Sequence, residues 1–394
     1  MSKSSFAPFR DFLERESSSG ILLLIAAGLG LLIANSPLAE SYFTLLDYSI
    51  TIESIGITMS VLKVINYGLM TIFFFVVGLE IKRELSSGHL ASLRLAAAPF
   101  FAALGGMAVP AVIYLAIAGR QAPEGWAIPV ATDIALAVGI LALLGSRATQ
   151  GLKSFLLALA VIDDIGAIVI IALVFSSGAV LSWLVAAIAT VLALLILQRL
   201  GVMKRYIYAL VGVLLWYSLY KAGLHPTLAG VIMGLLAPAT AISNTRFHDT
   251  EDGTLTIVEK LQGEFHGFSA YIIVPLFAFA NSGIALSADV FRSIFASPIA
   301  WGIIAGLAIG KPLGIFAAAR AANAMRIAQL PPGTSNAALF ATGSVAGIGF
   351  TVAIFIAKLA FTNQSEIDLA VAAVMIGSLL SGIIGAALFR LVRR

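Results

Sequence analysis

The chain is a series of long apolar stretches separated by short polar connections. A different pattern covers residues 47–60, where apolar and polar residues alternate around Ser54 and Gly56. Because this period is typical of strands, we expect a small β-hairpin there, outside the membrane. Twelve apolar stretches are long enough, or nearly so, to cross a bilayer, with boundaries good to a few residues: 18–35, 60–80, 95–118, 125–144, 155–175, 180–198, 205–220, 223–240, 268–287, 299–319, 336–357 and 367–389.

Two polar segments frame this pattern. Near the start, Phe6, Phe9 and Leu13 recur at helical spacing among charges, which predicts a surface helix over 1–17 on the cytoplasmic side. The start lacks an apolar core with a small-residue cleavage site, so a removed signal peptide is not expected. The segment 238–267 is predicted to be a cytoplasmic loop, too short for a domain of its own. The whole chain, 1–394, is therefore expected to form a single transmembrane domain.

Composition supports an integral, all-α, multi-pass membrane protein. Hydrophobic residues make up 60% of the chain and charged residues 11%, whereas a soluble domain carries roughly 25% charged residues. The absence of cysteine excludes disulfides, thiolate metal sites and cysteine nucleophiles. No Walker loop is present, so an ion gradient must supply any transport energy. The net charge of +4 comes from basic residues scattered in short loops, so no nucleic-acid partner is expected.

The distribution of these basic residues predicts the orientation. With the N-terminus inside, 18 of the 24 Lys and Arg residues fall on the inner side, five fall outside, and Lys311 lies within a span. An excess of Lys and Arg in cytoplasmic loops is the usual topological signal. Both termini are therefore expected to face the cytoplasm.

The apolar run 155–175 contains two adjacent carboxylic acids, Asp163 and Asp164, as its only ionisable groups. Placing both at the centre of a membrane helix costs about 5–7 kcal/mol on insertion scales. A purely structural pair, neutralised by protonation or a basic partner, is one reading. Intramembrane acids more often mark ion or proton pathways. Successive helix positions differ by about 100°, so the two acids are expected to have unequal roles.

Two further charges fall at membrane depth. Asp133 follows Pro129 and Thr132, and it either offsets backbone dipoles at a helix break or takes part in transport. Lys311 lies between Gly310 and Pro312, and it is either a structural counter-ion or a carrier of a transported proton.

Glycines and a proline predict breaks in the fourth and eleventh spans. The eleventh contains Gly343, Gly347 and Gly349 within seven residues, and the fourth carries Pro129 and Gly139 on either side of its acid. Glycine is also common at packed membrane helix interfaces, so the glycines of either span alone are weak evidence for a break. Together they predict irregular backbone, which is tolerated at this depth where it lines a cavity or packs against protein.

The motifs resemble the NhaA family of Na⁺/H⁺ antiporters. The match runs in order across nearly the whole chain: FFVVGLEIKREL, ATDIALAVGIL, LALAVIDDIGAIVII, GLHPTLAGV, VPLFAFANSG, GKPLGI and GSVAGIGFTVAIFI. The resemblance implies twelve transmembrane helices with inverted repeats formed by helices 3–5 and 10–12, and helices 4 and 11 discontinuous. Interrupted spans in corresponding halves are typical of inverted-repeat transporters, but this family is itself a standard example of them, so the breaks give the resemblance no independent support.

The resemblance also implies site residues and partners. Asp163 and Asp164 match the ion-binding pair, Thr132 and Asp133 the unwound part of helix 4, and Lys311 the buried lysine that can pair with Asp163. Members of the family lie in the bacterial inner (plasma) membrane and form homodimers through a β-hairpin, which 47–60 matches in this chain. It is a transporter without a cofactor, not an enzyme, and exchanges internal Na⁺ or Li⁺ for external H⁺, with net charge movement and activation at alkaline pH.

The residues support this chemistry directly. Carboxylate oxygens suit hard cations such as Na⁺. Because burial disfavours the charged form of a carboxyl group, a proton and a cation compete for the same oxygens. We favour Asp164 as the principal Na⁺ ligand and Asp163 as the partner that alternates between a proton and Lys311. With two acids at the site, two protons can exchange for one Na⁺, in which case net charge moves.

Candidates for pH sensing are less specific. Glu80 and Glu84 flank Lys82 and Arg83, which fits either a salt-bridged helix end or a pH-sensing cation funnel. His225 can titrate near neutrality or serve as a hydrogen-bonded structural residue. Glu264 and His266 are further candidates, although Gln262 and its surroundings depart from the best-known family pattern, which is richer in Glu and His.

Three rival functions can be weighed. An intramembrane aspartyl protease would need acids on different helices in a Gly-x-Gly-Asp context, and this motif is absent from the sequence. A prenyltransferase would need a third acid three residues after Asp164, where this chain has Ala167. A sodium-coupled symporter of an organic anion on the same fold is the serious alternative. It would require a roomy polar pocket, whereas the predicted breaks are lined mostly by small and aliphatic residues.

Overall fold

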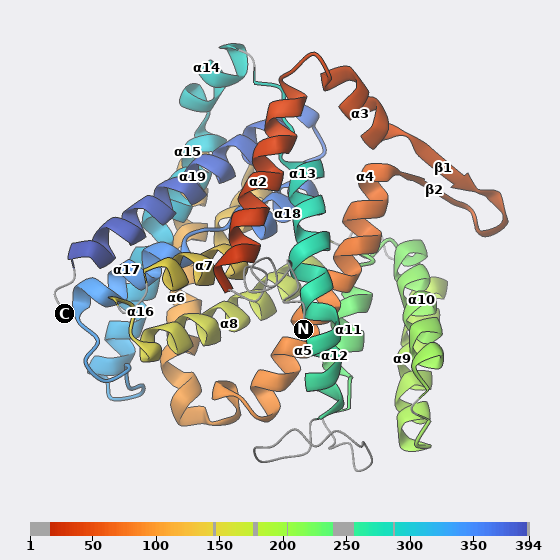
Figure 1. Ribbon diagram of the computed structural model, residues 1–394, viewed down its shortest axis with the longest axis horizontal. Coiled ribbons are helices and arrows are strands. Elements are labelled where there is room, and N and C mark those ends of the chain that lie inside the picture. The colour runs from red at the N-terminus through yellow and green to blue at the C-terminus, as the bar shows by residue number, and fades with distance from the viewer. Residues whose placement is uncertain are drawn as a thin grey trace, which may run out of the picture. The chain divides into compact units, whose positions relative to one another are not determined.

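The part of the chain that the structure describes folds into packed helices with one small sheet (Figure 1). The computed structural model describes residues 16–144, 147–175, 180–202, 204–238, 256–286 and 288–391. Within these ranges, eight helices are long and apolar enough to cross a membrane, judged by length and composition. The number rises to ten if each of two sharply bent helix pairs counts as one span. The fold is therefore that of a polytopic helical membrane protein.

The chain divides into two compact units. The first unit comprises 1–49, 92–167 and 275–394, and the second comprises 50–91 and 168–274. Helix α8 (Gln150–Val174) begins in the first unit and ends in the second.

The first unit contains the two interrupted spans. One consists of the 3₁₀ helix η4 and helix α7 with an irregular connection, and the other of α17 and α18, which are bent by 49°. Its helices, besides most of α8, are α2 (Glu16–Ala34), α3 (Ala39–Asp47), α6 (Leu93–Ala118), η4 (Pro123–Val130), α7 (Ile134–Leu143), α13 (Val274–Asn281), α14 (Ala288–Ala296), α15 (Pro298–Ala305), η7 (Gly306–Gly310), α16 (Lys311–Ala324), α17 (Asn336–Ala346), α18 (Phe350–Ala360) and α19 (Gln364–Leu391).

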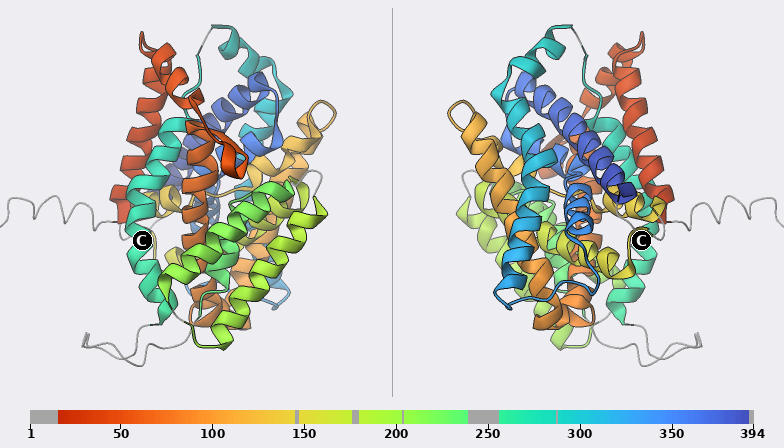
Figure 2. Two further views of the ribbon diagram at one scale, coloured as in Figure 1. Left: turned by 90° about the vertical axis from the view of Figure 1, so that its right-hand side faces the viewer. Right: turned by 90° about the vertical axis from the view of Figure 1, so that its left-hand side faces the viewer.

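The second unit carries the sheet. Its helices α9 and α10 pack side by side, as the green ribbons in Figure 2 show. The elements are β1 (Ser49–Ile52), η1 (Glu53–Ile55), β2 (Ile57–Ser60), α4 (Val61–Lys63), η2 (Val64–Leu69), α5 (Met70–Ser86), η3 (His89–Ala91), α9 (Leu181–Arg199), α10 (Arg205–Ala222), α11 (Leu228–Leu235), α12 (Ile257–Phe268) and η6 (Ser269–Ile273).

The hairpin predicted over 47–60 is present as β1 and β2. Gly56 takes the left-handed conformation at φ 59° in the turn, which explains a glycine there. The turn is also fixed to α10, since the Tyr217 hydroxyl donates to the Ile55 carbonyl at 2.8 Å and Lys221 Nζ donates to the Gly56 carbonyl at 2.7 Å.

The predicted loop 238–267 is partly wrong. Residues 239–255 lie outside the described residues, but the remainder forms α12, which continues through η6 into α13. The reason is a capping box, because the Thr256 side chain accepts the Glu259 N–H while the Glu259 side chain accepts the Thr256 N–H. The predicted ninth span is therefore the end of a helical segment that runs from 257 to 281.

Other differences concern the ends of spans. The expected spans 205–220 and 223–240 correspond to α10 and to the eight-residue α11, neither of which is among the helices judged able to cross alone. The short helices α3 and α14 were not predicted. Most of the predicted surface helix over 1–17 lies outside the described residues, and α2 already begins at Glu16.

Close packing of α6 against α16 fixes the position of Lys311. A Cβ added to Gly105 would collide with the Gly314 carbonyl, and one added to Gly314 would collide with the Gly105 carbonyl. Backbones approach this closely only where both residues lack a side chain. Just before Lys311, the chain forms one π turn, η7, a feature frequently found at functional sites.

Candidate functional site

The two interrupted spans of the first unit cross at their breaks. The Asp133 N–H donates to the Ile348 carbonyl at 2.6 Å, and the Thr132 hydroxyl lies 2.9 Å from the Ala346 carbonyl. A Cβ on Gly349 would come within 3.1 Å of the Ala131 carbonyl. The irregular backbone of each break therefore supplies hydrogen-bond partners for the other, which satisfies polar groups that have no water at this depth.

Asp133 joins the beginnings of two half-helices. Its Oδ1 accepts the Leu136 N–H at 3.1 Å and so caps α7. Its Oδ2 accepts the backbone N–H of Thr351 at 3.1 Å and the Thr351 hydroxyl at 2.5 Å, in the first turn of α18. Helix N-termini carry partial positive charge. A carboxylate that is only 2% exposed is thus held between two such ends.

Lys311 and Asp163 form a buried ion pair. Lys311 Nζ lies 2.8 Å from Asp163 Oδ2, with the two side chains 0% and 1% exposed. Lys311 also donates to the Val130 carbonyl, at the C-terminal end of η4, where a cation is favourable. Breaking such a pair by removing one partner leaves an uncompensated buried charge, which is strongly destabilising.

Thr132 links this ion pair to the crossing. Its hydroxyl lies 2.8 Å from Asp163 Oδ2 and 2.9 Å from the Ala346 carbonyl. A hydroxyl has one proton to donate, so the two acceptors share it or alternate. Among the described residues, Asp163 Oδ1 is buried without a hydrogen-bond partner. One carboxylate oxygen is thus fully engaged while the other is open to a proton or a cation.

Asp164, the next residue of α8, is also buried, at 8% exposure. The site therefore combines two adjacent carboxyl groups, one lysine, one hydroxyl and backbone carbonyls. Oxygen ligands of this kind suit a hard cation.

The candidates for pH sensing all belong to the second unit: Glu80, Glu84, His225, Glu264 and His266. Glu84 lies 3.4 Å from Arg83, and Glu264 makes two contacts of 3.1 Å with Arg205. The His225 Nδ1 lies 2.6 Å from the Thr227 hydroxyl, and its ring packs edge-on against Tyr67 at 5.0 Å.

Sequence reasoning missed Thr351. It follows the glycine-rich break by two residues, but no local pattern could show that it contacts an acid 218 positions earlier. The carbonyls of Val130, Ala346 and Ile348 were missed for the same reason, since only the fold brings them to the site.

Comparison with known proteins decides the family. The profile of the family described as Na⁺/H⁺ antiporter 1 matches residues 10–389. The chain belongs to this family. It is 45% identical over 389 residues to the Na⁺/H⁺ antiporter NhaA of Yersinia pseudotuberculosis, covering 97% of this chain and 96% of the relative. It is 44% identical to the protein of the same name from Escherichia coli and 43% identical to that of Shewanella frigidimarina, covering 94–95% of each chain.

Membership in the Na⁺/H⁺ antiporter 1 family covers the whole region described above. The matched residues include every residue of the crossing and of the Lys311–Asp163 pair. The relatives are named as antiporters, which are transporters rather than enzymes.

Proposed function

We propose that this chain exchanges cytoplasmic Na⁺ or Li⁺ for external H⁺ in the inner membrane of a bacterium. One observation carries the proposal: in a member of an Na⁺/H⁺ antiporter family, a buried Lys–Asp pair and a second carboxyl group adjoin the crossing of two interrupted helices. Buried acids at membrane depth mark ion and proton pathways. The ions themselves are the cargo, and the exchange needs no cofactor.

The finer fold that we propose has twelve spans, with helices 3–5 and 10–12 as inverted repeats. The interrupted spans support this arrangement, because η4 with α7 is the second member of one triplet and α17 with α18 is the second member of the other. In this scheme α10 and α11 complete the twelve. The family is a known example of such repeats, so the scheme rests on membership as well as on the breaks.

We propose further that both termini face the cytoplasm. The excess of Lys and Arg on the inner side supports this direction. Contacts between distant residues support the underlying span topology, because each joins segments assigned to the same side. Arg94 lies 3.1 Å from Gln329 in segments assigned to the inside. Lys221 contacts Gly56, and Asn35 contacts the Ile284 carbonyl at 2.8 Å, in segments assigned to the outside.

The proposed cycle uses the two acids unequally. Asp164 is the principal Na⁺ ligand. Asp163 contributes its Oδ1, the oxygen that is not engaged by Lys311. When Na⁺ leaves on one side, a proton takes its place on Asp164. Asp163 alternates between Lys311 and a proton, so the site never carries excess negative charge while it changes sides. Excess charge in a membrane interior is costly, which makes the neutralised site the one that reorients readily.

Asp133 and Thr132 have positioning roles in this proposal. Asp133 holds the N-terminal ends of α7 and α18 together, and Thr132 connects Asp163 to the carbonyl end of α17. A rearrangement of the crossing is thereby coupled to the occupancy of the acids. If two protons replace one Na⁺, each cycle moves net charge, and the membrane potential contributes to the driving force.

Regulation and assembly are proposed as well. We propose that Glu80, Glu84, His225, Glu264 and His266 contribute to activation at alkaline pH, and that two copies of the chain associate through the 47–60 hairpin. The packing of the hairpin turn against Tyr217 and Lys221 supports a fixed orientation of its two strands.

Exchange in inside-out vesicles tests the central proposal. Vesicles with an acidic interior are followed with a pH-sensitive dye while Na⁺, Li⁺ or K⁺ is added outside. Na⁺ is expected to dissipate the gradient, and its failure at every pH from 6.5 to 9 would overturn the antiporter assignment. Asp164→Asn is expected to abolish exchange with the protein still inserted, whereas Asp47→Asn, at an exposed position at the end of α3, keeps it.

A further inference from the structure

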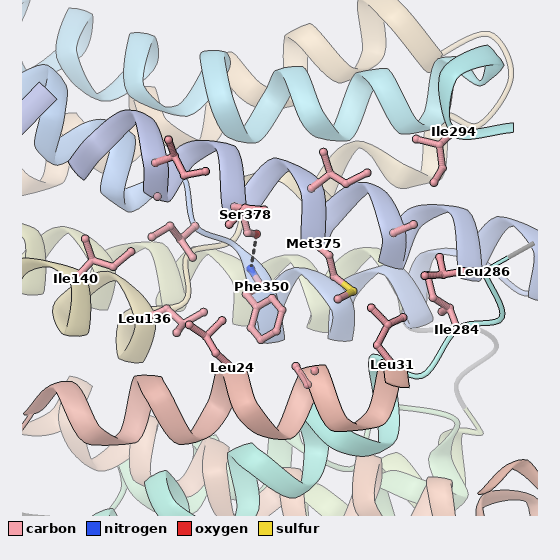
Figure 3. A pocket seen from close by; sticks show the side chains of 18 of the residues that line it. Leu24, Leu31, Leu136, Ile140, Ile284, Leu286, Ile294, Phe350, Met375 and Ser378 are labelled. Atoms are coloured by element: carbon pink, nitrogen blue, oxygen red, sulfur yellow. Dashed lines mark hydrogen bonds between the residues drawn. The ribbon is translucent and has the colours of Figure 1, made fainter. Parts of the chain in front are cut away.

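The first unit contains an apolar cavity beside the crossing. Its volume is about 590 Å³, and its walls come from α2, α7, α14, α19 and the break between α17 and α18. Figure 3 shows Leu24 and Leu31 of α2 facing Met375 of α19, with Phe350 between the two helices. On α2 the wall residues Leu24, Ala27, Gly28 and Leu31 have the spacing of one helical face.

The walls offer almost nothing to a polar ligand. Of the 19 lining residues, Ser378 is the only one with a polar side chain. Its hydroxyl oxygen already accepts the Phe350 N–H at 3.1 Å. Cavities lined by apolar groups exclude water and accept apolar ligands. The occupant is therefore a hydrocarbon and not an ion or a headgroup.

The cavity is continuous with the apolar surface of the molecule. Leu24, Leu379 and Ile383 line it, yet these side chains are 54%, 65% and 56% exposed. In a protein that spans a bilayer, exposed aliphatic side chains at membrane depth face lipid. The volume also falls within the range of roughly 300–1,000 Å³ typical of small-ligand sites.

We propose that this cavity binds an acyl chain of a bilayer phospholipid. Such a chain is flexible, wholly apolar along its length and present at high concentration beside the exposed wall residues. A second copy of the protein would have to insert a side chain here, and this alternative is one of the outcomes tested below.

The acyl chain would lie against the back of the ion-site scaffold. The wall residue Ile348 supplies the carbonyl that accepts the Asp133 N–H, and the wall residue Leu136 donates its own N–H to Asp133 Oδ1. Phe350 precedes Thr351, the other partner of Asp133. Occupancy of the cavity therefore supports the crossing of the two interrupted helices, although the lipid contacts no ion ligand.

Gly28 allows the cavity to be filled from within. A Cβ at this position would meet no heavy atom within 4 Å, and the residue lies on the wall face of α2. Gly28→Phe therefore projects a ring into the cavity, and replacing glycine in a helix does not itself weaken the helix. The matched control is Leu29→Phe, the next residue of the same helix, which is 47% exposed and does not line the cavity.

The test uses a phosphatidylethanolamine with a diazirine near the end of one acyl chain, reconstituted with the full-length protein. After illumination, adducts are mapped by mass spectrometry. We expect labelling of residues 24–31 and 372–386 to exceed that of α9, whose residues Val185 and Ile196 are 56% and 57% exposed and serve as the internal reference. Gly28→Phe should lower labelling at the wall several-fold, while Leu29→Phe leaves it unchanged.

Three outcomes would overturn the proposal. Wall labelling no stronger than that of α9 would mean ordinary lipid contact. Equal labelling of Gly28→Phe and wild type would place the acyl chain elsewhere. Cross-links between two protein copies at the wall would identify a second chain as the occupant. Should Gly28→Phe fail to fold, Gly28→Leu fills less of the same space and gives the same readout, which requires no transport activity.

Discussion

Lys311 Nζ lies 2.8 Å from Asp163 Oδ2, and solvent reaches almost no part of either side chain. Lys311→Met keeps an unbranched side chain as far as Cε but removes the charged Nζ. Because one partner of a buried pair is then left alone, we expect a loss of about 3–5 kcal/mol unless the carboxyl takes up a proton. Apparent melting temperature in detergent measures this loss.

The same variant should acquire a pH dependence. A folded state that holds a proton on Asp163 binds one more proton than the unfolded chain at neutral pH, so its stability falls as pH rises. Across pH 6 to 9 the melting temperature of Lys311→Met is expected to decrease more steeply than that of wild type. The double variant Lys311→Met with Asp163→Asn is the control, since a neutral pair should regain stability and lose the slope. An equally steep slope in the double variant would locate the titration elsewhere.

Thr351→Val tests the connection between α18 and Asp133. The substitution conserves shape and keeps the backbone N–H, but removes the hydroxyl that donates to Asp133 Oδ2 at 2.5 Å. A hydrogen bond to a charged group contributes about 1.5–3 kcal/mol, so lower thermal stability and slower exchange are expected. Thr342→Val is the matched control, because that buried hydroxyl bonds only the Ala338 carbonyl of its own helix. Equal effects of the two substitutions would argue against a special role for Thr351.

Gly314→Ala tests whether the position of Lys311 matters apart from its charge. The added methyl would collide with the Gly105 carbonyl and push α16 away from α6. We expect reduced exchange in vesicles with every ionisable group intact. In Gly263→Ala the methyl meets open space on α12, so that control should keep wild-type exchange and gain up to about 1 kcal/mol of helix stability. Unchanged exchange by Gly314→Ala would show that the lysine tolerates displacement.

Sequence patterns predicted the parts of this structure that depend on local chemistry. Alternation around Gly56 located the hairpin, and apolar length located most spans. The adjacent acids at 163 and 164 could be singled out because charge is conspicuous in an apolar run. Each of these signals is contained within a few neighbouring residues.

The remainder depends on long-range contacts or on polar helices. Helix α12 was taken for loop because Glu259, Lys260 and Glu264 lower its hydropathy, although Thr256 and Glu259 form a recognisable capping box. Thr351 could not be paired with Asp133 because the contact exists only once the two interrupted spans cross. Local patterns thus indicate the charged ligands of the site but not the groups that hold them.

The hairpin turn provides a test of the proposed dimer. Tyr217→Phe combined with Lys221→Met removes both side-chain donors to the carbonyls of Ile55 and Gly56. With its turn released, the hairpin should hold a partner less well, so the dimer fraction in detergent, measured by light scattering, is expected to fall. Tyr206→Phe, at an exposed position of the same helix, is the control. An unchanged dimer fraction in the double variant would mean that the turn contacts do not support association.

The pH dependence of Na⁺ affinity separates competition at the acids from remote sensing. If protons occupy the same oxygens as Na⁺, each competing proton raises the apparent KM for Na⁺ about tenfold per unit decrease in pH, by mass action, while the maximal rate at saturating Na⁺ changes little. If log KM rises by about two per unit decrease in pH, two protons compete with each Na⁺, which would support two exchanged protons. KM and maximal rate are measured in inside-out vesicles from pH 6.5 to 9.

A constant KM with a pH-dependent maximal rate would contradict competition and favour control by groups of the second unit, such as Glu264 or His266. Variants Glu264→Gln and His266→Gln would then flatten the rate profile, whereas under competition they leave the KM slope intact.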